Sequence, residues 1–121
     1  MQKNILLADD DPAVRRMLCR VLAEENYFVI PVSDADEALR KLRNLQVDLI
    51  VLDLDLPHMA ASDALFRRFK DERPSIPVIL ISSHRDENLA NDLNGIRMEK
   101  PLDVSELVRT IGKLLHEKVG A

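Results

Sequence analysis

A chain of 121 residues is the length of a single domain, and a domain of this size buries roughly two-thirds of its surface when it folds. Hydrophobic residues make up 46% of the sequence and charged residues 31%, which excludes the composition of a disordered chain. The formal net charge is -4, and the Lys and Arg residues are scattered along predicted helices, which argues against a nucleic-acid-binding surface.

Short apolar runs alternate along the chain with stretches in which apolar residues recur every three or four positions. The first pattern predicts strands, and the second predicts helices. In the first half we expect a strand over 4–8, a helix over 12–25, a strand over 27–32, a helix from a cap at Ser33 to residue 44, and a strand over 47–53. In the second half we expect a helix over 62–72, a strand over 76–82, a weaker helix over 85–93, a strand over 96–99 and a helix over 103–117.

Local signals support several of these boundaries. Asp11 stands directly before Pro12, which is typical of an N-cap followed by the first helical residue, so we assign Asp11 to the helix rather than to a metal site. Asp103 and Glu106 have the spacing of a capping box. Pro31 predicts an edge strand, because proline has no N–H to donate to a neighbouring strand.

The alternation of five predicted strands with five predicted helices favours right-handed βαβ crossovers. This indicates an α/β fold, a doubly wound five-stranded parallel sheet with helices on both faces. The runs at 47–53 and 76–82 are almost wholly apolar, which predicts strands that are buried on both faces. We expect a single domain covering residues 1–121, since the sequence shows no internal repeat or linker.

The sequence also bears on the compartment. The apolar runs are too short to span a membrane, and Met1 is not followed by a basic stretch and a long apolar segment. Cys19 has no second cysteine with which to form an internal disulfide, and its position on the predicted helix suits a buried structural thiol in a reducing environment. We therefore expect a cytoplasmic protein.

Acidic residues stand at the ends of two predicted strands. Asp9 and Asp10 follow the strand at 4–8, and Asp53 ends the strand at 47–53. Sites in open parallel sheets form outside the carboxyl ends of the strands, so these carboxylates converge if the two strands are neighbours. Such a cluster is destabilising unless a cation neutralises it. Carboxylate oxygens without a cysteine or histidine pair favour Mg²⁺, or alternatively Mn²⁺, over zinc.

Two further polar residues end predicted strands. Ser82 ends the strand at 76–82, and Lys100 follows the strand at 96–99. A carboxylate, a metal ion, a hydroxyl donor and an ammonium group are together what the transfer of a phosphoryl group to a carboxylate requires. The metal ion and Lys100 would hold the charge of the transferring group while Asp53 attacks.

Four motifs occur in order at the ends of predicted strands: "ADDDP", "LIVLDLDLP", "PVILISS" and "EKPLD". With them the sequence resembles the receiver domain of two-component response regulators over nearly its whole length. The resemblance implies a CheY-like, flavodoxin-like fold with the sheet order 2-1-3-4-5. It also implies phosphorelay signal transduction, in which a histidine kinase or phosphotransfer protein donates a phosphoryl group and the phosphoprotein changes its binding to an output domain or protein.

The same resemblance implies roles around the metal. Asp53 would be the phosphoacceptor, which becomes an aspartyl phosphate, and would also bind Mg²⁺. Asp10 would be a second direct Mg²⁺ ligand, whereas Asp9 would act through a metal-bound water. The backbone carbonyl of Asp55 would complete the protein ligands.

The remaining implied roles concern the switch. Ser82 would turn its hydroxyl toward the phosphate, Lys100 would pair with the phosphate, and the Lys100-Pro101 bond would be cis. The chain would not be an enzyme beyond phosphorylating itself and, at most, removing its own phosphate. No direct contact with nucleic acid or membrane is implied, and a homodimer is compatible with the pattern.

The sequence departs from the family pattern at several positions. Ala60 and Ala61 stand where the family usually has Asp-Gly. The stretch that holds the helix at 85–93 is shorter than usual by roughly one turn, so we expect this fourth helix to be truncated or irregular. Arg97 stands where a Tyr or Phe commonly moves inward with the hydroxyl, and an arginine cannot be buried there without a partner for its charge.

Two alternatives remain. Arg97 and the short fourth helix favour a pseudo-receiver, a protein-binding module that is never phosphorylated. A haloacid dehalogenase-type phosphatase would use Asp53 as nucleophile and Asp55 as acid/base, but Pro57 and the short chain fit that class poorly. The sequence is compatible with a stand-alone receiver and with a receiver that is part of a longer regulator or hybrid kinase.

Overall fold

The computed structural model describes residues 2–53, 62–83 and 95–116. In these ranges the elements are β1 (Asn4–Ala8), α1 (Pro12–Glu24), β2 (Phe28–Val32), α2 (Ala35–Asn44), β3 (Leu49–Asp53), α3 (Ser62–Glu72), β4 (Val78–Ser82), β5 (Ile96–Glu99) and α5 (Val104–His116). The helix expected over 85–93 lies outside the described residues. So do Asp55, Pro57, Ala60 and Ala61, and the expected last residue of the final helix at 117.

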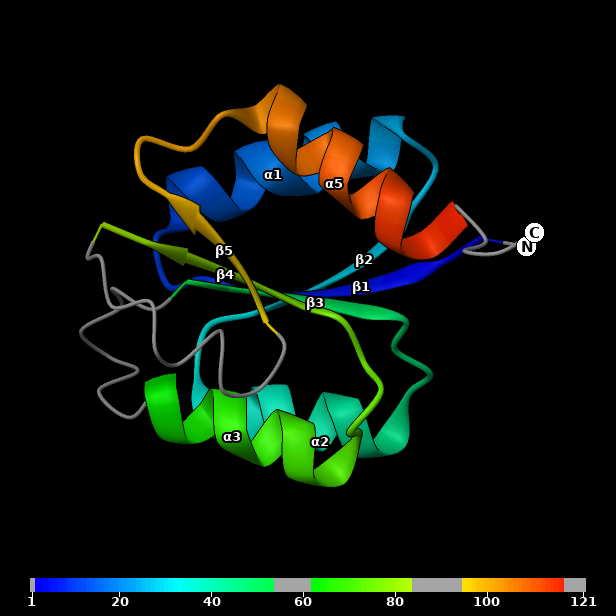
Figure 1. Cartoon of the computed structure of the whole chain (residues 1–121), viewed down its shortest axis with the longest axis vertical. Helices are drawn as coiled ribbons and strands as arrows, with labels where there is room; N and C mark the ends of the chain where they lie inside the picture. The colour runs from blue at the N-terminus through cyan, green and yellow to red at the C-terminus, as the bar shows by residue number, and fades with distance from the viewer. Residues whose placement is uncertain (1, 54–61, 84–94, 117–121) are drawn as a thin grey trace.

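The five strands form one parallel sheet in the order β2-β1-β3-β4-β5. Helices α1 and α5 cover one face of this sheet, and α2 and α3 cover the other (Figure 1). The prediction of a doubly wound sheet in the order 2-1-3-4-5 is therefore confirmed. None of the helices in the described ranges is both long and apolar enough to cross a membrane.

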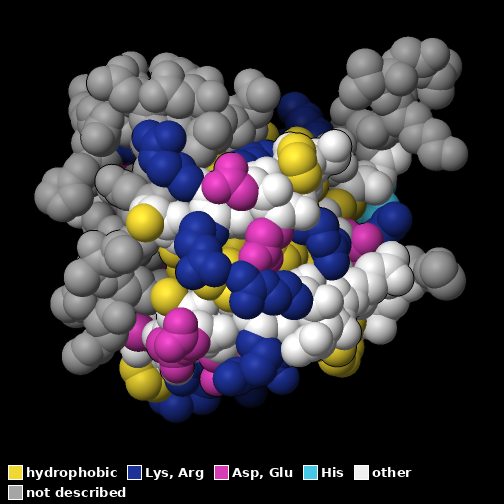
Figure 2. Space-filling view, turned by 90° about the horizontal axis from the view of Figure 1, so that it is seen from below, with side chains coloured by type: hydrophobic (Ala, Val, Ile, Leu, Met, Phe, Trp, Pro, Cys, Tyr) yellow, Lys and Arg dark blue, Asp and Glu magenta, His cyan; other side chains and the backbone are white. Residues whose placement is uncertain are grey.

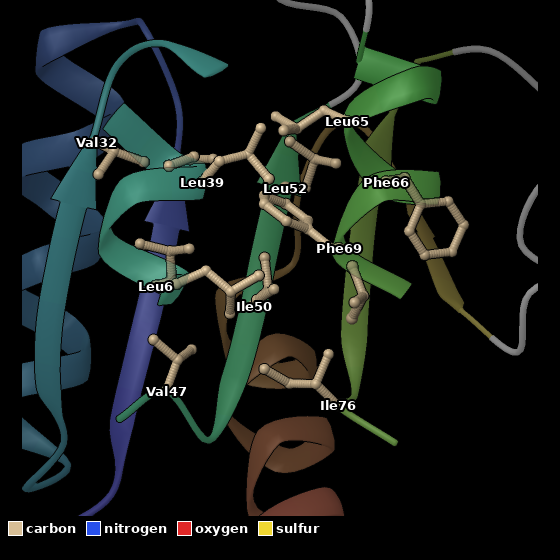
Figure 3. Close-up of a cluster of buried hydrophobic side chains, with 14 of the residues drawn as sticks. Leu6, Val32, Leu39, Val47, Ile50, Leu52, Leu65, Phe66, Phe69 and Ile76 are labelled. Atoms are coloured by element: carbon tan, nitrogen blue, oxygen red, sulfur yellow. The ribbon is translucent and has the colours of Figure 1, made fainter. Parts of the chain in front are cut away.

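The core consists of two layers, because successive strand residues point to opposite faces. On one face Leu39 of α2 and Phe69 of α3 pack with Ile50 and Leu52 of β3 (Figure 3). On the other face Leu18 of α1 and Ile111 of α5 pack with the alternate strand residues. Every residue of β3 and β4 is buried, as their continuous apolar runs predict. Burying one such large apolar side chain stabilises the fold by roughly 1.5–3 kcal/mol.

The helix caps agree with the sequence at α1 and at α5, where Asp103 Oδ1 accepts the N–H of Glu106 at 3.1 Å, but not at α2. The Asp11 carboxylate accepts the N–H groups of Ala13 and Val14, which confirms it as the cap of α1. The cap of α2 is Asp34, whose Oδ1 accepts the N–H of Glu37 at 2.8 Å, so the prediction of Ser33 is wrong. Asp34 is the N-cap instead of Ser33 because it is the residue directly before the first turn of α2. A carboxylate is as good an N-cap acceptor as a hydroxyl.

Several strands start later than the apolar runs that predict them. Pairing in β3 begins at Leu49 rather than at residue 47, and pairing in β4 begins at Val78 rather than at residue 76. Val47 and Ile76 are nevertheless buried in the core. Apolar runs therefore report burial, and the ladder of hydrogen bonds covers only part of the buried segment.

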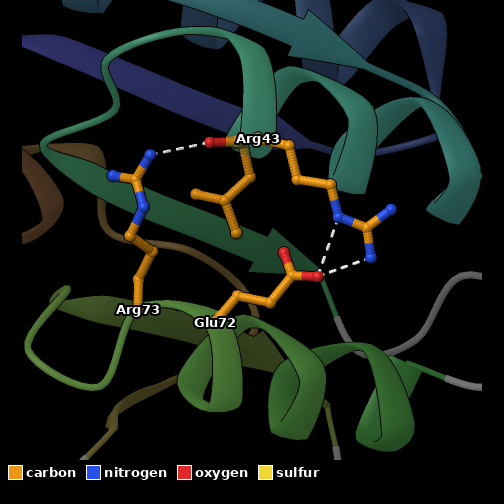
Figure 4. A network of polar contacts seen from close by, with 4 residues as sticks. Arg43, Glu72 and Arg73 are labelled. Carbon is orange, nitrogen blue, oxygen red and sulfur yellow. Dashed lines mark hydrogen bonds and ion pairs between the residues drawn. The ribbon is translucent and has the colours of Figure 1, made fainter.

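Polar contacts join α2 to α3 on the outside of the apolar layer (Figure 4). Arg43 Nε donates to Glu72 Oε1 at 2.8 Å. Arg73 Nη2 donates to the main-chain oxygen of Leu42 at 2.9 Å, which satisfies a carbonyl near the end of α2. These contacts fix how the two helices lie beside each other, while the apolar layer beneath supplies most of the stability.

Cys19 is half-buried and packs against the layer beneath α1 and α5. Burial raises the pKa of its thiol, which favours the neutral form. The structure thus supports the reading of Cys19 as a packing residue.

Two glycines provide a matched test of packing. A Cβ at Gly95 would lie 2.8 Å from Cζ of Phe66 and 3.2 Å from Cδ1 of Leu80, and both side chains are fully buried. Gly95→Ala should therefore lower the free energy of unfolding by about 1–3 kcal/mol. A Cβ at Gly112, inside α5, would meet nothing within 4 Å. Gly112→Ala should raise it by about 0.5–1 kcal/mol. Urea denaturation measures both, and equal effects would contradict the close contact at Gly95.

Candidate functional site

Polar side chains gather where the strands of the sheet end. Asp9 follows β1, Asp53 ends β3, Ser82 ends β4 and Lys100 follows β5. The strands are parallel and β1 lies beside β3, with Ala8 opposite Leu52, so Asp9 and Asp53 are level with each other at the same edge of the sheet. The predicted convergence of these carboxylates is therefore a direct result of the strand order.

A pocket of about 450 Å³ lies at this edge. Its polar lining consists of Asp9, Asp10, Asp11, Asp53 and Lys100. Apolar side chains of α1 and the segment after β5 complete the wall, among them Met17 and Leu102. Charged groups at the strand ends therefore face a cavity with a largely apolar rim, where electrostatic interactions are stronger than in open solvent.

An ion pair forms the centre of the site. Lys100 Nζ lies 2.9 Å from Asp53 Oδ2. Asp53 is only 5% exposed, so its carboxylate needs a compensating charge in the folded protein. The main chain positions the lysine, because its N–H donates to the main-chain oxygen of Ser82 at 3.0 Å. The Lys100-Pro101 bond is cis, as the resemblance to receiver domains implied.

Asp9 is the most deeply buried carboxylate of the site, with 2% exposure. Its Oδ1 accepts the N–H of Asp11 at 2.9 Å, and its main-chain oxygen accepts Arg15 Nη1 at 2.8 Å. Burial raises the pKa of Asp9, and the charge of Asp53 raises it further, although the Asp11 N–H and Lys100 oppose the shift. The site therefore carries more negative charge than Lys100 compensates.

Asp10 and Asp11 differ in their surroundings, although both line the pocket. Asp10 is half-buried, whereas Asp11 is exposed and its carboxylate is used by the N-terminus of α1. The cap role predicted for Asp11 is confirmed, and the role of Asp10 as a metal ligand stays a prediction.

The donor set of the pocket fits Mg²⁺. No three Asp, Glu, His or Cys side chains among the described residues are close enough to hold a metal ion by themselves. Mg²⁺ does not require such a group, since it is commonly held by one or two carboxylates and keeps several waters. The pocket offers carboxylate oxygens in surplus over cations and space for waters. Asp55, whose backbone carbonyl the resemblance to receiver domains adds to the set, lies outside the described residues.

Ser82 lies at the end of β4 with 3% exposure. It is opposite Glu99 in the register of β4 and β5, and its main-chain oxygen accepts the Lys100 N–H. Its main chain therefore adjoins Lys100 at the edge of the sheet where the strands end. The role of its hydroxyl remains a prediction.

Arg97 is a charged residue with a largely buried side chain. It lies on β5 opposite Leu80, and its side chain is only 12% exposed. Its Nη1 is 3.8 Å from Oε1 of Glu99, while Nε and Nη2 are buried and have no hydrogen-bond partner among residues 2–53, 62–83 and 95–116. The sequence flagged this position, and the structure shows that burial is not fully compensated.

Arg15 belongs to the site but was not predicted from the sequence. Its guanidinium holds the main-chain oxygen of Asp9, and so it fixes the segment that carries the acidic residues. The available signal was its place one turn after the Asp11 cap, where an α1 side chain can reach back over the start of the helix.

Comparisons with known proteins agree with these features. The family model of the response regulator receiver domain matches residues 5–111. The response regulator RR06 of Streptococcus pneumoniae serotype 2 is 33% identical over 117 residues, which cover 93% of this chain and 53% of that protein. The hybrid signal transduction histidine kinase D of Dictyostelium discoideum is 32% identical over 119 residues, which cover 94% of this chain and 8% of that protein. The chain thus spans about half, or far less, of the length of these relatives.

Solved structures show the same architecture. A CheY-like response regulator receiver domain protein from Methanospirillum hungatei has a TM-score of 0.87 at 25% identity, covering 95% of this chain and 94% of its own. The response regulator TrrA of Thermotoga maritima, in complex with Mg²⁺ and BeF, has a TM-score of 0.83 at 26% identity, covering 94% of this chain and all of its own. TrrA in complex with the histidine kinase ThkA gives the same TM-score and identity, covering 94% of this chain and 99% of that chain.

The raised pKa of Asp9 gives a pH-dependent prediction. An acid whose pKa is raised by folding destabilises the fold when ionised, at pH values above its ordinary value of 3.8, and this cost disappears as pH falls below that value. Asp9→Asn removes the charge and keeps an oxygen that can accept the Asp11 N–H. Without Mg²⁺, it should raise the free energy of unfolding at pH 7, and the gain should vanish toward pH 3.8.

Urea denaturation across this pH range measures the effect. The exposed Asp71 on α3 is the control, and Asp71→Asn should change stability by less than about 0.5 kcal/mol. A destabilised Asp9→Asn protein at pH 7 would show that the carboxylate is not under net strain.

The two buried guanidinium nitrogens of Arg97 that lack a partner among the described residues, Nε and Nη2, predict that removal of the guanidinium stabilises the fold. Arg97→Met keeps an unbranched side chain of similar reach without buried N–H groups, so the free energy of unfolding should rise by about 1–3 kcal/mol. Arg109→Met, at an exposed position of α5, is the matched control and should have an effect near zero. If Arg97→Met is the less stable of the two variants, the guanidinium has compensating interactions after all.

Proposed function

Because the chain belongs to the family of response regulator receiver domains of two-component signalling, we propose that Asp53 accepts a phosphoryl group from the phosphohistidine of a histidine kinase or phosphotransfer protein. The observation that carries the proposal is the Asp53 carboxylate, buried at the end of β3 with Lys100 Nζ 2.9 Å away. Its neighbours Asp9 and Asp10 line the same pocket.

In the proposed reaction an oxygen of Asp53 attacks the phosphorus. A P–O bond forms while the P–N bond to the donor imidazole breaks, and the imidazole nitrogen keeps the electron pair. Lys100 stays beside the acceptor and pairs with the oxygens of the incoming group, which carry the negative charge. The buried setting of Asp53 limits access of water, which favours transfer over loss of the group.

Asp10 and Asp53 would hold Mg²⁺ directly, Asp9 would act through a bound water, and the backbone carbonyl of Asp55 would complete the protein ligands. When bound, Mg²⁺ supplies positive charge to the phosphoryl oxygens. The surplus of carboxylates over cations at the pocket supports this assignment. TrrA, which shares this fold at 26% identity, is known in complex with Mg²⁺ and BeF.

Ser82 is the candidate switch hydroxyl. It is almost fully buried at the strand end next to Asp53, and its main chain is hydrogen-bonded to Lys100. A hydroxyl at this place would donate to a phosphoryl oxygen and move away from its present position. The Lys100 N–H is bonded to the main-chain oxygen of Ser82. A movement of Ser82 would therefore also displace Lys100 and the segment between Lys100 and α5.

The partners follow from the family. The relative TrrA is known in complex with the histidine kinase ThkA, and another relative is itself a hybrid histidine kinase. We therefore assign a histidine kinase or phosphotransfer protein as donor and a separate protein or attached domain as output. The proposed setting is the cytoplasm, and the only catalysis is phosphorylation and dephosphorylation of the chain itself.

A pseudo-receiver that is never phosphorylated is the second candidate. Arg97 favours it, because a buried guanidinium occupies the position where the family commonly has an aromatic side chain that moves during switching. The ion pair between Asp53 and Lys100 and the buried Asp9 oppose it, since a binding module gains nothing from buried charges at this edge.

Phosphate uptake distinguishes the two candidates. Incubation with Mg²⁺ and acetyl phosphate should add the mass of one phosphoryl group to the chain, as intact mass spectrometry shows. The adduct should be absent in Asp53→Asn, because an amide is a far poorer nucleophile than a carboxylate, and absent when a chelator removes Mg²⁺.

Asp34→Asn is the control for this experiment. It makes the same chemical change at the end of a strand but away from the pocket, and asparagine caps a helix as well as aspartate does. It should take up phosphate as the parent does. Absence of the adduct in the parent with several phosphoryl donors would favour the pseudo-receiver.

A further inference from the structure

Exposed apolar side chains gather at one edge of the molecule. Among the described residues, the exposed large hydrophobic side chains are Met17 (41%), Phe28 (52%) and Leu45 (41%). Phe28 is part of β2, the strand at the edge of the sheet beside β1. Met17 and Leu45 belong to two grooves that flank β2, on its α1 side and its α2 side, and both grooves include Pro31.

Cations surround these apolar side chains. The two grooves are lined by five basic residues, Arg15, Arg16, Arg20, Arg40 and Lys41, and by a single acidic residue, Glu37. The chain as a whole has a net charge of -4, so this edge has the opposite sign to the rest of the molecule. The basic residues are scattered in the sequence, and the fold brings them together from α1 and α2.

None of the five cations has an ion-pair partner within the described part of the chain. Arg15 donates to the main-chain oxygen of Asp9, which leaves four cations available to a partner: Arg16, Arg20, Arg40 and Lys41. On the α2 and α3 side of the molecule, Lys and Arg side chains lie at the surface together with Asp and Glu side chains (Figure 2). We call these four cations, together with Met17, Phe28 and Leu45, the β2-edge surface. An apolar centre with a positive rim is suited to a partner that carries the complementary pattern.

The backbone of β2 excludes one form of recognition. The N–H of Phe28 and the main-chain oxygen of Val32 are bonded toward β1. Because successive residues of a strand face opposite ways, Val29 and Pro31 direct their backbone groups outward. Pro31 has no N–H, so a partner strand cannot form a continuous ladder here. A partner must therefore be bound through side chains.

We propose that the β2-edge surface binds an amphipathic helix of a partner protein, with leucine-like side chains against Phe28, Met17 or Leu45 and Glu or Asp side chains against the cations. A helix forms its backbone hydrogen bonds internally, so it needs none from β2. Its apolar and acidic side chains would complement the apolar and basic side chains of the β2-edge surface. The apolar centre favours such a segment over nucleic acid, which would use the cations alone. The inference does not depend on phosphorylation of Asp53.

The probe is a fluorescein-labelled peptide of about 18 residues, with Leu along one helical face and Glu on both flanks. Fluorescence anisotropy with the whole chain should show saturable binding. In ¹⁵N-labelled protein, the amide signals that shift should include Met17, Phe28 and Leu45. A peptide with Lys in place of every Glu should bind at least about tenfold more weakly.

Charge reversal tests the site. Arg40→Glu combined with Lys41→Glu should weaken binding of the Glu peptide at least about tenfold. The matched control is Arg67→Glu combined with Arg68→Glu, two adjacent exposed arginines on α3, which makes the same change in net charge and should weaken binding less than about twofold. Phe28→Ser should weaken binding without changing the charge. Phosphate uptake from acetyl phosphate should be the same in all these variants, which separates this inference from the proposed function.

Three results would overturn the proposal. Equal losses in the two charge-reversed pairs would reduce the binding to general attraction between an acidic peptide and basic surfaces. Concentration-dependent dimers in sedimentation that disappear with Phe28→Ser would make a second copy of the chain the occupant. A single-stranded oligonucleotide that displaces the Glu peptide and shifts the same amide signals would make nucleic acid the occupant.

Discussion

The structure of the site depends on one pairing, that of a buried carboxylate at the end of β3 with an ammonium group supplied by the segment after β5. These residues are far apart in the sequence, and only the order β2-β1-β3-β4-β5 brings the two strand ends to the same edge. The hydrogen bond from the Lys100 N–H to Ser82 fixes the lysine relative to β4. The ion pair between Asp53 and Lys100 therefore depends on the strand order and the register. The site forms only when the whole sheet has formed.

The fold tolerates charge that a purely structural domain would avoid. Asp9 is buried beside Asp53 with a raised pKa, and Arg97 is buried with two unpartnered nitrogens. Elsewhere the described residues follow ordinary rules, with apolar layers on both faces of the sheet and capped helices. Local departures from good packing chemistry are most common where a protein binds or reacts. The apolar layers beneath α1, α2, α3 and α5 supply the stability that offsets the cost of these buried charges.

Much of this could be predicted from the sequence because burial and charge are visible there. Continuous apolar runs predicted β3 and β4, and acidic residues at strand ends predicted the convergence of Asp9 and Asp53. The errors lie where two residues compete for a local role, as Ser33 and Asp34 do at the cap of α2, or where burial continues beyond pairing, as at Val47. Arg15 and the cations around β2 could not be predicted as groups, because only the packing of α1 and α2 beside the sheet brings them together.

Pro31 has a consequence for the behaviour of the protein at high concentration. An edge strand with free N–H and C=O groups is a template on which other chains can add strand by strand, and this is a common start of aggregation. At β2 the missing donor at Pro31 interrupts that template one residue before the strand ends. The chain can therefore expose apolar side chains at the β2 edge while Pro31 hinders pairing with the strands of other chains and growth of the sheet into a fibre.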